Sequence, residues 1–165
     1  MNKNIYFQSK RLTIGNIFLY ADDDGLLALE FSANPKFKEA VLSKNNQILN
    51  QAFLELEEYL KGERKKFEVK LNPKGTEFQK FACKTLSKIP WGKVMSYGEQ
   101  SKKMNRPNAQ RATGSANGKN PLPIIIPCHR IITADQKLGG YSGDIKLKAK
   151  LLEIEGHQVI DGRVV

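Results

Sequence analysis

Residues 95–118 read MSYGEQSKKMNRPNAQRATGSANG, and this stretch decides the fold class of the second part of the chain. Ser96 and Glu99 form a capping box, which predicts a short helix over residues 97–104. After an Asn-Arg-Pro turn, a second short helix is predicted over residues 109–117 and ends at a glycine. Two short helices joined by a tight turn are typical of a helix-turn-helix.

The flanking residues extend this helical pattern in both directions. Thr76 and Gln79 form another capping box, and apolar residues then recur at helical spacing as far as Pro90. Three isoleucines at 124–126 indicate a short buried strand, and residues 145–155 predict a last helix. We therefore expect a mainly helical region that contains a winged-helix-like helix-turn-helix.

The first part of the chain has the pattern of short strands joined by hairpins. Strands are predicted over residues 5–7, 12–20 and 25–31, with an Asp-Asp-Asp-Gly turn between the last two. A helix is predicted over residues 45–61, and alternation over residues 67–71 predicts a half-buried strand.

These patterns predict an α/β (α+β) protein with two domains. Residues 1–72 form a small N-terminal α/β domain with an antiparallel sheet, and residues 76–165 form the helical C-terminal domain. The 165 residues are enough for this, and 40% hydrophobic with 27% charged residues is ordinary for a soluble globular protein. No apolar run approaches the roughly 20 residues that span a bilayer, and no signal peptide is recognised. A cytoplasmic or nuclear location is expected.

The charge is unevenly distributed along the chain. The formal net charge is +10, but residues 1–60 hold six Lys/Arg and eight Asp/Glu, a net of −2. Residues 61–165 hold 21 and nine, a net of +12. A solvated basic surface would explain this, but so concentrated an excess favours a nucleic-acid partner for the second domain.

Cys128 is the candidate nucleophile, because it follows the isoleucine run and directly precedes His129. A thiol is mostly protonated at neutral pH and burial raises its pKa further, so it needs a base, usually a histidine. Adjacent side chains on a regular strand point to opposite faces. Contact between these two therefore requires an irregular backbone or a bridging water.

Two other interpretations fit these residues. One is a buried Cys–His pair without a catalytic role. The other is a structural zinc site, for which the chain offers Cys83, Cys128, His129 and His157. No two of these residues have the usual close ligand spacing, which argues against zinc. Cys83 lies beside an apolar helical stripe and fits a structural thiol.

The run Pro127-Cys128-His129-Arg130, with Asn120-Pro121-Leu122-Pro123 before it, resembles the active site of the O6-alkylguanine-DNA alkyltransferases. The resemblance covers residues 76–156 in the family's order, about half of the chain. The other matching segments are Phe78-Gln79, Pro90-Trp91-Gly92-Lys93-Val94, Ser96-Tyr97-Gly98, Arg111-Ala112, Gly114-Ser115-Ala116-Asn117-Gly118, Gly140-Tyr141-Ser142-Gly143 and Leu151-Leu152-Glu153-Ile154-Glu155-Gly156. The first 70 residues match in length and α/β character alone.

The resemblance implies a set of catalytic roles. Cys128 would accept the alkyl group, and His129 would deprotonate it through a bound water. Glu155 would orient His129. Asn120 would hold the neighbouring backbone and the thiolate, and Tyr97 would donate toward the guanine ring.

The resemblance also implies how substrate and DNA are bound. Arg111 would enter the DNA stack and fill the gap left by a flipped guanine. The remaining DNA contacts would come from small residues of the recognition helix and a basic residue beside the nucleophile: Ala112, Gly114, Ser115, Ala116, Asn117 and Arg130. The substrate pocket would be lined by Pro123, Tyr141, Ser142 and Gly143.

The implied activity is DNA repair by a single, irreversible transfer of an alkyl group from O6-alkylguanine in double-stranded DNA to the protein, with O4-alkylthymine as a further candidate substrate. The partner is DNA, no membrane is involved, the protein is expected to be a monomer, and no cofactor is needed. Some family members bind zinc through N-terminal cysteines and histidines, and this chain has neither residue before Cys83. Two alternatives remain on the same sequence: a lesion-binding protein without catalysis, and a helix-turn-helix regulator with an incidental thiol.

Overall fold

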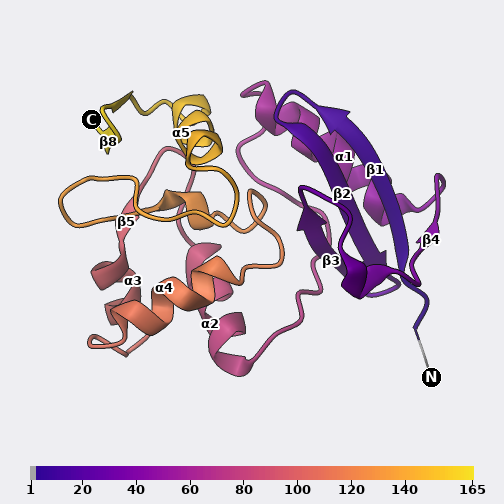
Figure 1. Ribbon diagram of the computed structural model, residues 1–165, viewed down its shortest axis with the longest axis horizontal. Coiled ribbons are helices and arrows are strands. Elements are labelled where there is room, and N and C mark those ends of the chain that lie inside the picture. Colours follow the sequence, from indigo (N-terminus) through magenta and orange to yellow (C-terminus); the bar gives the residue numbers. More distant parts are fainter. Residues whose placement is uncertain (1–2) are drawn as a thin grey trace. The chain divides into compact units, whose positions relative to one another are not determined.

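The computed structural model describes residues 3–165, which divide into two compact units, one that ends at Lys74 and one that spans Gly75–Val165. Both units combine helices with strands (Figure 1), so the predicted α/β class is confirmed. Within the described residues, no helix is long and apolar enough to cross a membrane.

The first unit is built on a four-stranded sheet in the order β3-β2-β1-β4. Strands β1 (Tyr6–Leu12), β2 (Gly15–Asp22) and β3 (Gly25–Glu30) pair antiparallel, as predicted. The predicted bounds of the first two strands, 5–7 and 12–20, are wrong, because β1 continues to Leu12 and β2 begins at Gly15. After the 3-10 turn η1 (Pro35–Phe37), the short edge strand β4 (Val41–Leu42) pairs parallel to β1, which the sequence did not predict.

Helix α1 (Gln47–Leu60) packs on this sheet and confirms the helix predicted over residues 45–61. The Asn46 side chain caps it by accepting a hydrogen bond from the Leu49 amide at 3.0 Å. Its buried face carries Leu49, Ala52, Phe53, Leu56 and Tyr59. Burying each large side chain of this kind contributes about 1.5–3 kcal/mol, so the helix face and the sheet together form the core of this unit.

The predicted strand at residues 67–71 is wrong. The segment reaches the sheet only through an isolated bridge between Leu26 and Leu71. The amides of Glu68 and Val69 donate instead to the buried carboxylate of Glu55, at 2.9 and 3.1 Å. A side chain of α1 therefore satisfies the backbone groups that a partner strand would otherwise pair.

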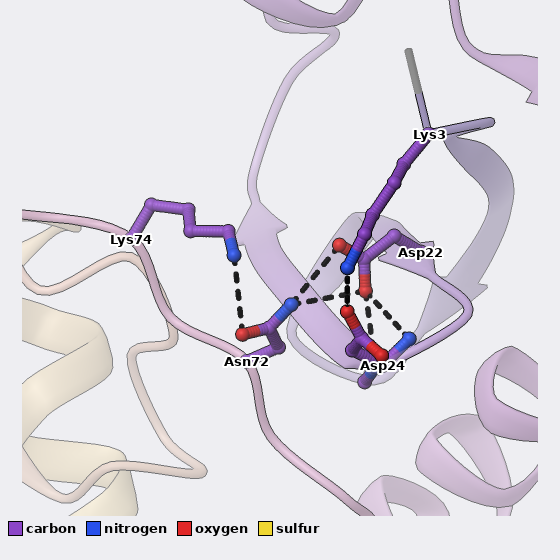
Figure 2. A network of polar contacts seen from close by, with 6 residues as sticks. Lys3, Asp22, Asp24, Asn72 and Lys74 are labelled. Atoms are coloured by element: carbon purple, nitrogen blue, oxygen red, sulfur yellow. Dashed lines mark hydrogen bonds and ion pairs between the residues drawn. The ribbon is translucent and has the colours of Figure 1, made fainter. Parts of the chain in front are cut away.

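Figure 2 shows how the end of this unit is held, through the side chain of Asp22. Its buried carboxylate accepts from the amides of Asp24 and Gly25, which fixes the β2–β3 turn, and from the Asn72 side chain at 3.0 and 3.1 Å. Lys74 in turn donates to Asn72. One carboxylate thus ties the hairpin turn to the last residues of the unit.

The second unit begins with three helices that enclose a small core. They are α2 (Glu77–Leu86), α3 (Tyr97–Lys103) and α4 (Gln110–Gly118), and both predicted capping boxes, at Thr76 and Ser96, are present. Ala82, Met104 and Ala116 pack together between them. Helices α3 and α4 form the predicted helix-turn-helix.

The remaining elements complete the unit. Strand β5 (Met95–Ser96) pairs parallel with β6 (Ile131–Ile132), which follows the 3-10 turn η2 (Cys128–Arg130). Helix α5 (Ile145–Ile154) packs on η2 and is followed by the hairpin of β7 (Val159–Ile160) and β8 (Arg163–Val164).

The three isoleucines before Cys128 are buried, but they form a turn and not the predicted strand. Ile124 has φ of +75°, and the Ile126 amide donates back to the Leu122 carbonyl at 2.8 Å. Positive φ is rare for a β-branched residue, so the apolar character of this run comes from its burial in the core and not from sheet pairing.

Candidate active site

The second unit contains a cavity of about 330 Å³ at the junction of the helix-turn-helix, η2 and the loop before α5. Its lining includes the buried sulfur-bearing residue Cys128 and the first residue of α3, Tyr97. The remaining lining residues come from α4 and from the loop: Gly114, Asn117, Gly118, Gly140, Tyr141 and Ser142. The cavity therefore joins a candidate nucleophile to a candidate recognition helix.

The isoleucine turn holds Cys128 at this cavity, and Asn120 holds the turn. The Asn120 side chain donates to the Ile126 carbonyl at 2.8 Å and accepts from the Leu122 amide at 3.0 Å. Burial raises the pKa of the Cys128 thiol, whereas a hydrogen bond from Asn120 and the positive charge of Lys148 act to lower it. Asn120 thus holds the backbone before Cys128 and acts on the pKa of its thiol.

His129 and Glu155 form a fully buried pair behind the nucleophile. Nε2 of His129 lies 2.7 Å from Oε1 of Glu155, at the C-terminal end of α5. Burial lowers the pKa of His129, although Glu155 acts to raise it, so the imidazole is neutral near pH 7. With the ring proton on Nε2 and directed at Glu155, the lone pair that can accept a proton is on Nδ1.

Arg130 is part of the same buried cluster. Its guanidinium donates from Nε and Nη2 to the two carboxylate oxygens of Glu155, at 2.9 and 2.8 Å, and from Nη1 to the Ile89 carbonyl. Burial alone would raise the pKa of Glu155, but the hydrogen bonds from His129 and Arg130 outweigh it and lower the pKa to about 2. Glu155 therefore stays ionised at any physiological pH.

Two tyrosines face the cavity. Tyr97 packs against Gly139, where a Cβ would lie 3.1 Å from the phenolic oxygen, so the loop passes close to its ring. Burial raises the pKa of Tyr97, and the Gly140 amide acts to lower it by a hydrogen bond. The hydroxyl of Tyr141 is buried and makes no hydrogen bond to another described residue. A buried polar group of this kind is available to a ligand in the cavity.

The DNA-contact residues predicted on helix α4 fall into two groups, one exposed and one buried. Arg111, Ala112 and Ser115 are exposed, and Gly114 lies on the cavity. Ala116 is buried in the helical core, and the Asn117 side chain is paired with Gln100 in two hydrogen bonds of 2.9 and 2.7 Å. Ala116 and Asn117 were expected on the DNA-facing surface. The structure buries Ala116 in the helix packing, and Asn117, also buried, lines the cavity.

Three further predicted positions differ from expectation. Arg130 is 6% exposed and engaged by Glu155, so its guanidinium is not on the surface where a DNA phosphate could reach it. Pro123 is buried in the isoleucine turn, and neither Pro123 nor Gly143 is among the residues that line the cavity. The sequence neighbourhood of Cys128 is basic, but the side chain of Arg130 turns into the core to balance a carboxylate.

Sequence reasoning missed Lys148, which is fully buried on α5. A signal existed, since Lys148 stands at helical spacing from the buried Leu151, Leu152 and Glu155 and so belongs to the inward face. Gly118 and Gly140 were quoted as motif glycines but were not assigned to the cavity that they line.

Cys83 lies on α2 and is buried as a free thiol. Burial raises its pKa to about 11, so it is protonated and unreactive at neutral pH. Within residues 3–165, no group of three or more Cys, His, Asp or Glu side chains is arranged to hold a metal ion.

Two family models match the chain, one to each part. The ribonuclease-like domain of 6-O-methylguanine DNA methyltransferase matches residues 5–73, and the DNA-binding domain of the same protein matches residues 77–157. The N-terminal match covers the region in which sequence motifs alone gave no family signal.

Individual relatives are similar over more than nine tenths of both lengths. The methylated-DNA–protein-cysteine methyltransferase of Methanosarcina acetivorans is 42% identical over 154 residues, 92% of this chain and 99% of its own. The constitutive enzyme of that name from Bacillus subtilis is 36% identical over 156 residues, 91% and 94%. The crystal structure of Mycobacterium tuberculosis OGT in complex with DNA is 37% identical, with a TM-score of 0.85 over 91% and 92% of the two chains.

Proposed function

Because the chain belongs to the methylated-DNA–protein-cysteine methyltransferase family, which repairs DNA by direct reversal, we propose that Cys128 is the cysteine that receives the alkyl group. The observation that carries this assignment is the cavity, which brings Cys128 together with Tyr97, α4 and the 140–142 loop. Cys83, the other cysteine, is buried on α2 and does not line this cavity.

The proposed substrate is O6-alkylguanine in double-stranded DNA. The O6 atom lies inside the duplex, so the base must be extruded to reach a buried sulfur. A cavity of about 330 Å³ is at the small end of ligand pockets, which suits a single base. The buried Tyr141 hydroxyl offers a polar contact to that base.

The chemistry is a displacement at the alkyl carbon. His129 takes the thiol proton of Cys128 through a water, and the thiolate forms a sulfur–carbon bond as the carbon–O6 bond breaks. The electron pair of that bond stays on guanine, which takes up a proton as Tyr97 donates toward the ring. Both electrons of the new bond come from sulfur, so the step needs no cofactor. The thioether is stable, so each molecule acts once.

Glu155 and Arg130 act behind the reacting atoms. The ionised Glu155 fixes the His129 proton on Nε2, which directs the accepting lone pair of Nδ1 away from the carboxylate. Arg130 holds Glu155 in place with two hydrogen bonds and neutralises its charge inside the core. We assign Arg130 to this positioning role in place of a DNA contact.

DNA docks on the exposed face of α4 in this proposal. Ala112 and Ser115 are small and exposed, so the helix backbone can approach the groove closely. Arg111, exposed on the same helix, fills the space that the flipped base leaves. We further propose that the protein acts as a monomer in the cytoplasm.

Intact-mass spectrometry after incubation with a duplex that carries O6-methylguanine tests the proposal. Wild-type protein and Cys83→Ser should each gain the mass of one methyl group, whereas Cys128→Ser should gain none and still bind the duplex. A mass gain in Cys128→Ser would contradict the assignment. Binding to the lesion without any mass gain in the wild type would favour a lesion-binding protein, and preference for a base sequence over a lesion would favour a regulator.

A further inference from the structure

Helix α5 buries a lysine completely. The side chain of Lys148 is 0% exposed and is among the largest fully buried side chains of the chain. Lysine is almost never fully buried unless its ammonium is compensated, because moving the charge out of water is costly. The groups around its Nζ atom therefore indicate how the positive charge is compensated and which role it has.

The ammonium of Lys148 joins the segment that follows Cys128 to a loop that lines the cavity. Nζ donates to the Ile131 carbonyl at 2.5 Å and to the Gly140 carbonyl at 3.1 Å. Ile131 directly follows η2, which carries Cys128, and Gly140 lines the cavity beside Tyr141. One side chain thus fixes the segment of the nucleophile relative to the loop that faces it.

Two carbonyl groups do not neutralise a full positive charge. Within residues 3–165, no carboxylate forms an ion pair with Lys148. Glu155, at the C-terminal end of the same helix, is engaged by His129 and Arg130. Strand β7, which also packs on α5, carries no titratable side chain. The compensating charge must come from the side of η2 and the cavity.

Cys128 is the group there that can supply a negative charge. Burial lowers the pKa of Lys148 to about 8, and the Cys128 thiolate acts to raise it again. The positive charge of Lys148 in turn lowers the pKa of Cys128. The other titratable groups near the thiol stay neutral, because burial raises the pKa of Tyr97, Tyr141 and Cys83 and lowers that of His129.

We propose that Lys148 is a positioning residue that supplies the counter-charge of the Cys128 thiolate and holds the 140–142 loop over it. The inference rests on the proposed role of Cys128. His129 removes the thiol proton, and Lys148 stabilises the anion that this leaves. His129 therefore acts on the protonated thiol of Cys128, and Lys148 acts on its thiolate.

The first test measures the pH dependence of thiol reactivity in a Cys83→Ser background, where Cys128 is the only cysteine. Iodoacetamide is the probe, because it reports thiolate without DNA or base binding. Lys148→Met keeps an unbranched side chain of similar length but removes the charge. It should move the midpoint of the Cys128 rate–pH profile to higher pH and slow alkylation at pH 7 by about tenfold or more. The rate should recover at high pH.

Lys146→Met is the matched control, since Lys146 is exposed on the same helix, and its profile should follow the parent protein. Lys148→Arg keeps the charge and should keep the midpoint near that of the parent. An unshifted midpoint in Lys148→Met, or an equal slowing at every pH, would overturn the proposal in favour of a packing role.

A second measurement does not depend on any Lys148 variant folding. The side-chain resonance of Lys148 is titrated by NMR in the parent protein and in Cys128→Ser. Loss of the thiolate should lower the midpoint of Lys148, and an unchanged midpoint would overturn the proposal. Neither measurement involves alkyl transfer, so failure of the proposed function would show only in the mass experiment on methylated DNA.

Discussion

The two units bury carboxylates in contrasting ways. In the first unit, Asp22 accepts hydrogen bonds from the Asp24 and Gly25 amides, and Glu55 accepts from the amides of Glu68 and Val69. The guanidinium of Arg64 lies farther from Glu55, at 3.8 Å. In the second unit, Glu155 is held by the side chains of His129 and Arg130, and both of these are themselves ionisable.

The difference separates a structural use of buried charge from a chemical one. A carboxylate bound by backbone amides fixes the path of the chain, because its partners cannot change protonation. A carboxylate bound by a histidine fixes the position of the ring and also selects the ring nitrogen that carries the proton. The first arrangement replaces strand pairing and ties turns in the N-terminal unit, and the second orients a buried histidine beside a cysteine.

The comparison is tested most strongly by removing one charge in each unit. Glu155→Gln should lower the free energy of unfolding by about 3–5 kcal/mol, because it leaves the buried guanidinium of Arg130 without its counter-charge. Glu55→Gln should cost only about 1–2 kcal/mol, since the amide oxygen still accepts from the backbone. Urea unfolding followed by far-UV circular dichroism measures both, and equal losses would contradict the distinction.

Acid should weaken the second unit in a defined pH range. The pKa of Glu155 is about 2 in the folded protein and 4.5 in the reference state, so the folded form binds fewer protons. Its contribution of about 3 kcal/mol is complete above pH 4.5 and is lost as the pH falls toward 2. Fluorescence of the single tryptophan, Trp91, reports unfolding of this unit. Stability that does not change between pH 4.5 and 2 would contradict the ionised cluster.

Sequence patterns predicted the elements whose partners are close along the chain. The capping boxes at Thr76 and Ser96 and the β2–β3 turn at Asp22 formed as expected, because each is a contact within a few residues. The errors at residues 67–71 and 124–126 have the opposite origin. A distant carboxylate took the amides of the first segment, and burial rather than sheet pairing explains the isoleucines of the second.

Distance along the sequence also explains which parts of the candidate site could be predicted. Cys128, His129 and Asn120 are near in sequence, and the family resemblance linked them to Tyr97 and Glu155. The orientation of Arg130 depends on Glu155 and Ile89, 25 and 41 positions away, so no local pattern could place it in the core. The role of Lys148 likewise depends on carbonyl groups of two other segments.

An exposed arginine in each unit allows a comparison of repair rates, with a smaller expected effect than the two losses of stability above. Arg111→Ala should slow repair of duplex DNA by about tenfold or more at saturating protein, because flipping a base costs a few kcal/mol that the inserted side chain offsets. Its reaction with the free base O6-benzylguanine should stay near the wild-type rate. Arg11→Ala, exposed on β1 of the first unit, is the control and should slow neither reaction. Equal slowing on both substrates would place Arg111 in the pocket or the fold.

The smallest expected effect concerns the end of the N-terminal unit. Asn72→Ala removes both side-chain hydrogen bonds to Asp22 (Figure 2) and should lower the free energy of unfolding by about 1 kcal/mol. Lys74→Ala, which removes only an exposed bond to Asn72, should change it by less. Both variants should transfer a methyl group at the wild-type rate, and a slower transfer would show that this network reaches the chemistry.

The buried side chains of the second unit serve one reacting atom, the sulfur of Cys128, which alone accepts the methyl group in our proposal. A duplex in which O6-methylguanine carries a trideuterated methyl group is reacted to completion with wild-type protein, which is then digested and sequenced by tandem mass spectrometry. We predict one label per protein, on Cys128, with an equal amount of guanine restored in the DNA. Label on Cys83 or on any other residue, or restoration of more guanine than there is protein, would contradict the account.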